Sequence, residues 1–218
     1  MNKKFVHGWW LPIEDEYFEN HFSFTPKVKN RSIYQFHHIN KCFEIIKERK
    51  GIAIDIGAHC GFWSFYLGAN FKKVYAFEPV KIFIECFKKN VPYKNVELFD
   101  VALGNENGYV SMNLNIKNTG GTQVSKILNL ENKVKIKKLD DYKFTNIDFI
   151  KIDVEGYEKK VILGAESTLL QNKPIIIIEQ KGTHSKYLNE NRYDAANTLK
   201  KFGMKIQEKV VDDLILTW

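Results

Sequence analysis

From residue 51 onward, apolar segments of strand length alternate with segments that have the residue spacing of helices. Strands are expected at residues 52–56, 74–77, 96–99, 147–152 and 175–178, and helices at 61–70, 80–90, 156–170 and 193–202. Such alternation is typical of a parallel sheet with helices on both faces. Residues 175–178 are all isoleucine, and a strand that is apolar on both faces belongs inside such a sheet. The predicted fold class is therefore α/β, a doubly wound sheet.

Two segments depart from this alternation. Residues 108–138 are expected to form inserted β structure, because apolar and lysine residues alternate from Lys133 to Lys137. Those lysines most simply form a solvated face. Residues 204–208 and 214–218 are expected to pair as an antiparallel hairpin at one edge of the sheet.

The chain divides into an N-terminal part and a main domain. Residues 1–50 begin with an aromatic-rich stretch that shows no helical or strand period, and helical spacing follows at 33–49. This part could form a lid over a substrate. Residues 51–218 form the main domain, with no linker or internal repeat.

The net charge of +7 raises the question of a nucleic-acid partner. Only three of the 33 basic residues are arginines: Arg31, Arg49 and Arg192. Arginine is the usual bidentate reader of guanine, and these three form no cluster in the sequence. A nucleic-acid partner is therefore not expected, although the charge keeps an RNA substrate as an alternative.

The cysteines and the N-terminus bear on the cellular compartment. The three cysteines, Cys42, Cys60 and Cys86, are an odd number at wide spacing, which argues against a disulfide framework and a zinc site. The N-terminal apolar stretch is interrupted by His7 and Gly8 and does not resemble a signal peptide. No stretch approaches the roughly 20 apolar residues of a membrane-spanning helix. A cytoplasmic location is expected, and the oligomeric state is left open.

The segment from Asp55 to Gly61 is the most informative turn in the sequence. Its glycines, Gly57 and Gly61, have the spacing G-x-x-x-G, which differs from the G-x-G-x-x-G of dinucleotide-binding folds. A carboxylate at Asp55 would repel a diphosphate but suits a ligand with an ammonium or a sulfonium group. The two glycines, with Ala58 and His59 between them, would let the backbone approach an amino-acid group closely. A side chain at position 57 would occupy that path.

The next two strand ends carry residues suited to an adenosine. Glu78, followed by Pro79, could accept both hydroxyls of a ribose. Asp100 could accept from an adenine amino group, while Val101 and Ala102 leave room for the ring. Because the carboxyl ends of parallel strands meet at one edge of a sheet, these residues together predict a site for S-adenosylmethionine.

The sequence resembles FkbM-type, S-adenosylmethionine-dependent methyltransferases. The residues that carry the resemblance are AIDIGAHCGFWSFYL (53–67), VYAFEP (74–79), DVALG (100–104), KKLDDY (137–142), IDFIKIDVEGYEKKVILGA (147–165) and PIIIIEQ (174–180). The family implies a Rossmann-like class I methyltransferase fold with a seven-stranded, mostly parallel sheet and an antiparallel edge strand. It also implies O-methylation of a hydroxyl, often on a sugar or a polyketide, so the expected acceptor is a small molecule or a glycan.

The candidate catalytic residues cluster where the fourth strand ends. Lys151 and Asp153 share one face of that strand, and Asp153 at its carboxyl end could act as the general base. Glu155 could orient the acceptor or accept from a sugar hydroxyl. Alternatively, Asp153 and Glu155 only face the positive N-terminus of the helix expected from 156.

Three further features lie near the expected site. Carboxylates at 153, 155 and 179 could in principle hold a magnesium ion, but no metal site is predicted. His184 is a candidate second base, and residues 118–122 form either a flap over the donor or a simple turn.

Three functions remain open on the sequence. The leading one is an O-methyltransferase acting on a small-molecule or glycan hydroxyl. The second is an RNA methyltransferase, although the D-P-P-Y, N-P-P-Y and Pro-Cys motifs of base-methylating enzymes are absent. The third is a module that binds the donor without catalysis.

Overall fold

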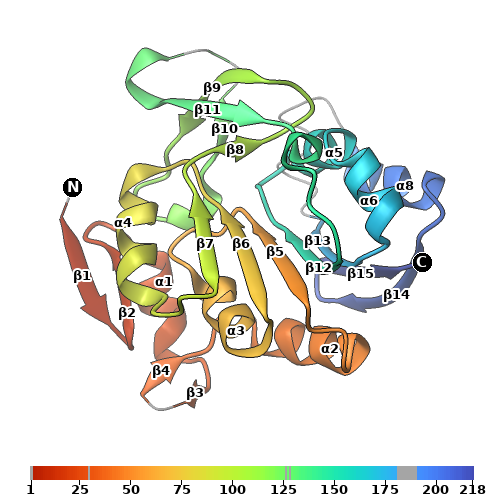
Figure 1. The fold of residues 1–218 in the computed structure, drawn as a ribbon. Coiled ribbons are helices and arrows are strands. Elements are labelled where there is room, and N and C mark those ends of the chain that lie inside the picture. Colours follow the sequence, from red (N-terminus) through yellow and green to blue (C-terminus); the bar gives the residue numbers. More distant parts are fainter. Residues whose placement is uncertain (1, 29, 126, 128, 181–190) are drawn as a thin grey trace.

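The centre of the molecule is a seven-stranded sheet (Figure 1). The computed structural model describes all residues except 1, 29, 126, 128 and 181–190. In spatial order the strands are β14 (Lys205–Val210), β15 (Asp213–Thr217), β13 (Ile175–Glu179), β12 (Ile147–Ile152), β5 (Ile52–Ile56), β6 (Lys73–Phe77) and β7 (Val96–Phe99). The last five run parallel, and β15 runs antiparallel to both β13 and β14. This confirms the predicted fold class. The predicted antiparallel strand is β15, and it lies one position inside the edge because β14 pairs along its outer side.

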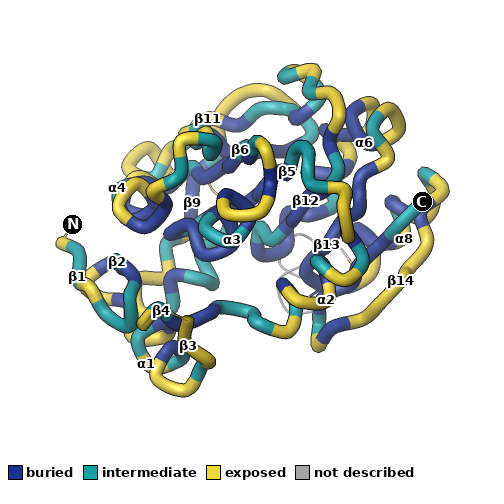
Figure 2. The backbone as a smooth tube through the Cα atoms, turned by 60° about the horizontal axis from the view of Figure 1, so that its bottom comes forward, coloured by how far each residue is buried: buried dark blue, intermediate teal, exposed yellow. Residues whose placement is uncertain are grey.

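Helices cover both faces of the sheet, as the α/β pattern requires. One face packs against α2 (Phe36–Ile46), α3 (Phe62–Asn70) and α4 (Lys81–Asn90), and the other against α5 (Glu158–Leu163), α6 (Glu166–Asn172) and α8 (Asp194–Lys201). The central strands β5, β12 and β13 are accordingly buried along nearly their whole length (Figure 2). In β13 every residue is buried, which explains its isoleucine run. Among the described residues, no helix combines the length and the apolar character needed to cross a bilayer.

Residues 108–138 contain three strands of a second, four-stranded sheet, whose fourth strand comes from residues 102–103. Its spatial order is β10 (Gln123–Ser125), β9 (Gly108–Asn113), β11 (Lys133–Lys137) and β8 (Ala102–Leu103). The short helices η1 (Thr119–Gly121) and η2 (Leu130–Asn132) lie between its strands, and η3 (Leu139–Tyr142) follows β11. Lys133 and Lys135 are exposed while Ile136 is buried, so the alternation has the solvated face expected from the sequence.

The N-terminal stretch, which shows no helical or strand period in the sequence, nevertheless contains regular structure. It contains a hairpin of β1 (Lys3–Val6) and β2 (Trp9–Pro12), the helix α1 (Tyr17–Ser23), and the short pair β3 (Lys27–Val28) and β4 (Arg31–Ser32). These elements are too short to show a period, and contacts with distant residues hold them in place. The backbone N–H of Trp10 donates to Asn90 on α4 at 2.8 Å, and the Asn90 amide donates back to the Trp10 carbonyl at 2.9 Å.

The single helix expected over 156–170 is wrong, because two helices, α5 and α6, occupy this range. A Cβ on Gly164 would lie 1.8 Å from the Gly104 carbonyl oxygen, so the chain passes close to another segment at this point. The Asp140 carboxylate then accepts from the backbone N–H groups of Ser167 and Thr168, at 3.1 and 2.8 Å, in the first turn of α6. Because the residue that accepts these hydrogen bonds lies 27 positions away, the start of α6 leaves no local signal in the sequence.

Candidate active site

Lys151 lies at the centre of the candidate site, on the face of the sheet that carries α3. The strand register pairs it with Asp55, so both side chains project from the same face. The Nζ atom lies 3.5 Å from Asp55 Oδ1 and 3.6 Å from Asp153 Oδ2, and it donates to the Gly57 carbonyl at 2.8 Å. One buried ammonium thus pairs with two carboxylates and fixes the glycine turn.

The electrostatics of Lys151 favour a permanently charged side chain. Burial by itself lowers the pKa of Lys151, but the carboxylates of Asp153, Asp55 and Glu179 raise it, and the net direction is upward. A lysine whose pKa is raised does not release its proton near neutral pH. This residue, predicted as catalytic, therefore suits a positioning role better than proton transfer.

The glycine turn is shaped by close contacts with its own scaffold. Gly57 has a φ of 74°, and a Cβ there would lie 1.9 Å from the Asp153 carbonyl oxygen. Gly61, with a φ of 89°, packs against Val91 and Phe87 on the α4 side. Both glycines are therefore required first by packing, whereas the sequence suggested only the approach of a ligand. Gly57 also lines the central cavity, and Gly61 does not.

Three other residues of the turn differ in their access to the cavity. Ala58 and His59 line it. Asp55 is fully buried beneath the turn, where it accepts from the Ser64 hydroxyl at 2.6 Å and pairs with Lys151. Asp55 is not among the described residues that line the cavity, so its expected contact with the donor stays a prediction.

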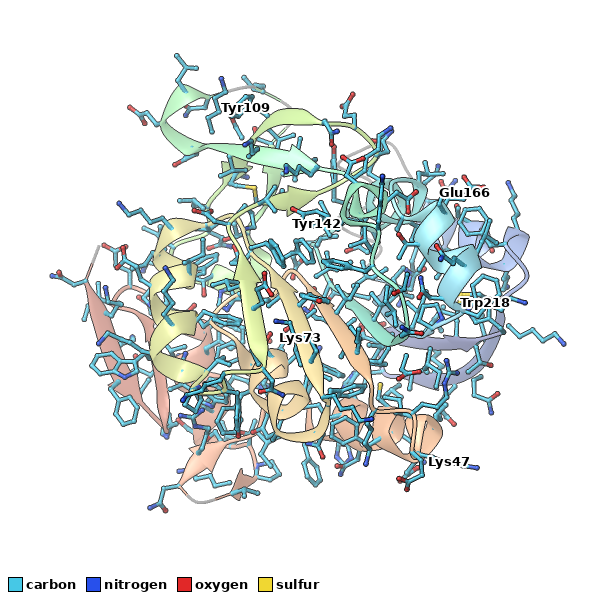
Figure 3. The ribbon with its side chains drawn as sticks, in the orientation of Figure 1. Lys47, Lys73, Tyr109, Tyr142, Glu166 and Trp218 are labelled. Carbon is cyan, nitrogen blue, oxygen red and sulfur yellow. The ribbon has the colours of Figure 1, made fainter. Side chains whose placement is uncertain are left out.

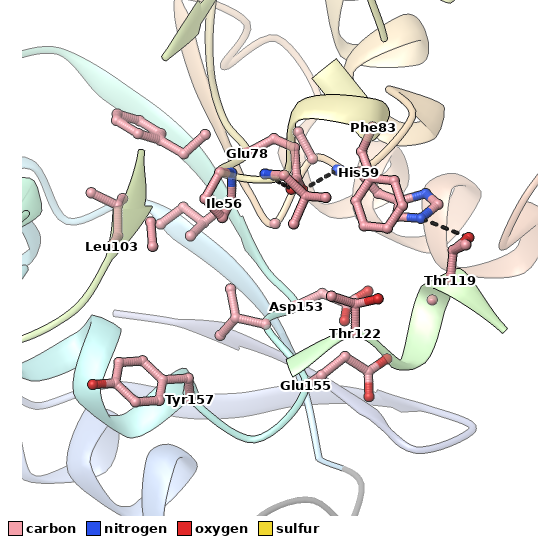
Figure 4. Close-up of a pocket in the computed structure, with 18 of the residues that line it drawn as sticks. Ile56, His59, Glu78, Phe83, Leu103, Thr119, Thr122, Asp153, Glu155 and Tyr157 are labelled. Atoms are coloured by element: carbon pink, nitrogen blue, oxygen red, sulfur yellow. Dashed lines mark hydrogen bonds between the residues drawn. The ribbon is translucent and has the colours of Figure 1, made fainter. Parts of the chain in front are cut away.

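Glu78 and Pro79 line the same cavity at the end of β6 (Figure 4). The Glu78 carboxylate accepts from the backbone N–H of His59 at 2.9 Å and from that of Val80 at 2.8 Å. Burial raises the pKa of Glu78 to about 7, although these two hydrogen bonds and the Lys151 charge oppose the shift. The residue predicted to bind the ribose thus has a pKa near neutral pH.

The residues predicted for the adenine divide into two groups. Val101 and Ala102 are buried and line the cavity together with Leu103. Asp100 is exposed and is not among the lining residues that the structure describes. The chain turns tightly here, since the Val101 N–H donates to the Phe99 carbonyl at 3.0 Å. The contact between Asp100 and adenine stays a prediction, without support from this arrangement.

Residues far apart in the sequence cover the cavity, and sequence reasoning missed most of them. Phe18 and Tyr34 come from the N-terminal part, Phe83 from α4, and Met112 from the inserted sheet. Two covering segments had been raised from the sequence: residues 1–50 as a lid and residues 118–122 as a flap or a turn. Thr119, Gly120 and Thr122 line the cavity. The cavity has a volume of about 90 Å³.

Three carboxylates converge beside the cavity. Oxygens of Asp153, Glu155 and Glu179 all lie within 4.8 Å of one another. Oxygen ligands in such a group suit a divalent cation, which is the possibility that the sequence raised. The Lys151 ammonium, 3.6 Å from Asp153, already supplies positive charge here. His184, the candidate second base, lies outside the described residues.

Glu158 shapes the loop that carries Glu155. Its carboxylate accepts from the backbone N–H groups of Val154 and Gly156, at 3.1 and 3.0 Å. Glu155 has a left-handed φ of 53°, and Gly156 one of 97°, which delays the start of α5 to Glu158. Burial raises the pKa of Glu158 to about 7 against these hydrogen bonds.

A larger groove, with a volume of about 750 Å³, adjoins the cavity. Tyr34, Gly120 and Glu155 line both spaces. The remaining lining residues are mostly amides and polar groups: Tyr17, Asn113, Leu114, Asn115, Ile116, Lys117, Asn118, Gly121 and Gln123. The asparagines of residues 113–118 were visible in the sequence, but nothing there indicated that they face Glu155.

The sheet order, with a cavity at the carboxyl ends of the parallel strands, defines a class I S-adenosylmethionine methyltransferase-like fold. An FkbM methyltransferase from Methylobacillus flagellatus KT matches with a TM-score of 0.51 and 15% identity, over 78% of this chain and 44% of that chain. A precorrin 8W decarboxylase from Methanobacterium thermoautotrophicum matches with a TM-score of 0.52 and 14% identity, over 89% and 93%. A putative methyltransferase from Streptococcus mutans in complex with SAH gives 0.50 and 13%, over 82% and 94%.

The family model of the methyltransferase FkbM domain matches residues 55–206. Because this is more than half of the chain, the protein belongs to the FkbM methyltransferase family and is an S-adenosylmethionine-dependent methyltransferase. The predicted family, fold class and donor are thereby confirmed. The chain spans less than half the length of the Methylobacillus protein. No curated protein sequence matches the chain.

Proposed function

We propose that this methyltransferase acts on a hydroxyl of a sugar, a glycan or another small molecule. The observation that carries this proposal is the groove that meets the donor cavity at Glu155 and Tyr34. Asparagine and glutamine side chains both donate and accept hydrogen bonds, which matches the hydroxyl groups of a sugar. Tyrosine adds an apolar face with a polar tip, suited to a polyhydroxylated ring.

We assign the donor to the smaller cavity. Glu78 would accept from the ribose hydroxyls, with Pro79, Val101 and Ala102 beside the adenosine. Gly57, Ala58 and His59 would face the amino-acid end. The donor supplies an electrophilic methyl group, and the chain's main contribution is to hold the acceptor hydroxyl in line with it, which can supply roughly 7–11 kcal/mol.

Asp153 is the proposed general base. It would accept the hydroxyl proton as the new C–O bond forms and the C–S bond of the donor breaks. The Lys151 ammonium lies 3.6 Å from the Asp153 carboxylate and would hold it in place for this role. Glu155, which lines both spaces, would orient the acceptor hydroxyl.

Donor entry would require the cover of the cavity to move. Pockets for ligands of this size measure roughly 300–1,000 Å³, and the cavity measures about 90 Å³. The residues that would shift are Tyr34, from residues 1–50, and Met112 and Val124, from the inserted sheet, which line the cavity. This supports a lid role for the N-terminal part.

The proposed compartment is the cytoplasm. Cys42, Cys60 and Cys86 are all buried free thiols. Unpaired cysteines of this kind suit a reducing environment.

The test is turnover with isotopically labelled donor and a panel of sugars and glycans, read by mass spectrometry as the addition of one methyl group. Asp153→Asn keeps the shape but removes the base, so turnover should fall by roughly 10²–10⁴ while donor affinity is nearly unchanged. Asn115→Ala, in the groove, is the matched variant that should raise KM with little effect on donor binding.

Three outcomes contradict the proposal. Methylated RNA, with binding that persists at raised salt and depends on sequence, would favour the RNA enzyme instead. Donor binding without any product, also with an extract of the host, would indicate a binding module. Full turnover of Asp153→Asn would remove Asp153 as the base.

A further inference from the structure

Three side chains from different parts of the chain form a hydrogen-bonded series that ends at the donor turn. Asp15 comes from the N-terminal part, Thr119 from the inserted sheet, and His59 from the turn after β5. The Thr119 hydroxyl bonds to Asp15, and it lies 3.0 Å from His59 Nε2 (Figure 4). Sequence reasoning assigned no role to Asp15.

Asp15 is held rigidly in this series. It is fully buried, and its carboxylate also accepts from the backbone N–H groups of Phe18, at 2.7 Å, and Thr119, at 3.0 Å. The Thr119 hydroxyl donates its single hydrogen to Asp15 Oδ2, the same oxygen that accepts from the Thr119 N–H.

This direction determines the tautomer of His59. Because the hydroxyl hydrogen of Thr119 is directed to Asp15, its oxygen is left to accept from His59, so Nε2 carries the hydrogen. The other ring nitrogen, Nδ1, then carries a lone pair. Nδ1 is buried and has no hydrogen-bond partner among the residues that the structure describes.

The surroundings of His59 keep its ring neutral. Burial and the Lys151 ammonium lower the pKa of His59 to about 3, although Asp153 and a backbone hydrogen bond with Thr119 act in the opposite direction. The ring packs against Phe83 at 4.2 Å and Phe18 at 5.2 Å between centroids. A neutral imidazole in an apolar setting presents one acceptor at a fixed position.

We propose that Asp15 and Thr119 are positioning residues that fix the Nε2–H tautomer of His59, so that Nδ1 accepts a hydrogen bond from the donor. His59 lines the cavity at the end assigned to the donor's amino-acid group, so the donor's ammonium group is the partner that fits. The inference rests on the assignment of the donor to this cavity. It adds that the N-terminal part and the inserted sheet both act on donor binding through one ring.

The test compares Thr119→Val with Thr119→Ser. Valine keeps the shape and removes the hydroxyl, whereas serine keeps the hydroxyl. The tautomer is read from the ¹⁵N chemical shifts of the His59 ring, and donor affinity from calorimetry with S-adenosylhomocysteine. Wild type and Thr119→Ser should show the Nε2–H form. Thr119→Val should show a mixture of tautomers and bind roughly three- to tenfold more weakly.

A double-variant cycle separates this role from simple packing. His59→Ala should weaken donor binding by itself, and Thr119→Val should then have little further effect, because it acts through the ring. Asp15→Asn gives a second perturbation of the same tautomer if Thr119→Val fails to fold, which thermal unfolding reports.

The inference is overturned if folded Thr119→Val keeps the wild-type ¹⁵N pattern and affinity, or if its effect persists undiminished in His59→Ala. These results differ from a failure of the proposed function. Wild-type enzyme that binds donor with the expected tautomer but methylates no hydroxyl would refute only the proposed function.

Discussion

At the scale of single residues, burial changes what Glu78 can do. The sequence placed a carboxylate at the end of the second strand, where it could accept from a ribose. The structure adds that the side chain is buried beside two backbone donors and has a pKa of about 7. Its charge therefore changes within the range in which enzymes are usually assayed.

Donor affinity should depend on pH near neutrality for this reason. If the ionised Glu78 binds the ribose, affinity falls as pH falls, and the ionised fraction drops by about fiftyfold from pH 7 to pH 5. Calorimetry at a series of pH values measures this, and Glu78→Gln should flatten the curve and lower affinity at pH 8. Glu158→Gln is the control, because Glu158 does not line the cavity. A curve with the same slope in Glu78→Gln would exclude Glu78 as its source.

At the scale of elements, the junction between β5 and α3 is defined by its contact with the end of β12. Gly57 and the Asp153 carbonyl approach so closely that no side chain fits between them. The Asp153 N–H also donates to the Ile56 carbonyl, at 3.2 Å. The donor turn and the strand that carries the proposed base are therefore one rigid unit, held also by Lys151.

Gly57→Ala should consequently destabilise the fold, beyond any effect on the donor. The methyl group would clash with backbone, and the left-handed φ of 74° disfavours alanine as well. We expect a loss of at least about 2 kcal/mol in the free energy of unfolding. Urea unfolding measures it, with Gly121→Ala as control, since its nearest neighbour to an added Cβ is a side chain at 3.5 Å. Equal stability of the two variants would contradict the packing argument.

At the scale of the whole molecule, burial of carboxyl groups sets the pH dependence of folding. The pKa values of Glu78 and Glu158 are both raised from 4.5 to about 7. Between these values the folded state holds protons that the unfolded state has released. Each group therefore reduces stability as pH rises through this window, by on the order of 3 kcal/mol per group.

This pH dependence can be measured as a difference in stability between a variant and the wild type. Glu158→Gln should gain stability relative to wild type as pH rises from 5 to 8, because glutamine has no proton to lose. Thermal unfolding at each pH measures the difference. Glu166→Gln, at an exposed position of α6 (Figure 3), should show a constant difference. A constant difference for Glu158→Gln would mean that its carboxyl group is ionised throughout.

The sequence by itself determined the parts that depend on local pattern. The strands β5, β7 and β12 agree with the predicted segments, because alternation and β-branched runs reflect which faces are buried. The glycine turn and Glu78 were found because sharp turns and strand ends have local chemical signatures.

Only the tertiary structure decided how distant segments meet. The split between α5 and α6, the cover of the cavity by Phe18, and the series from Asp15 to His59 all depend on residues tens of positions apart. The pKa values near 7 have the same origin, since they follow from burial. Contacts of this kind arise from the packing of whole elements, and no local period or propensity encodes them. The chain thus carries its donor turn in its sequence, whereas the enclosure of that turn is a property of the folded molecule.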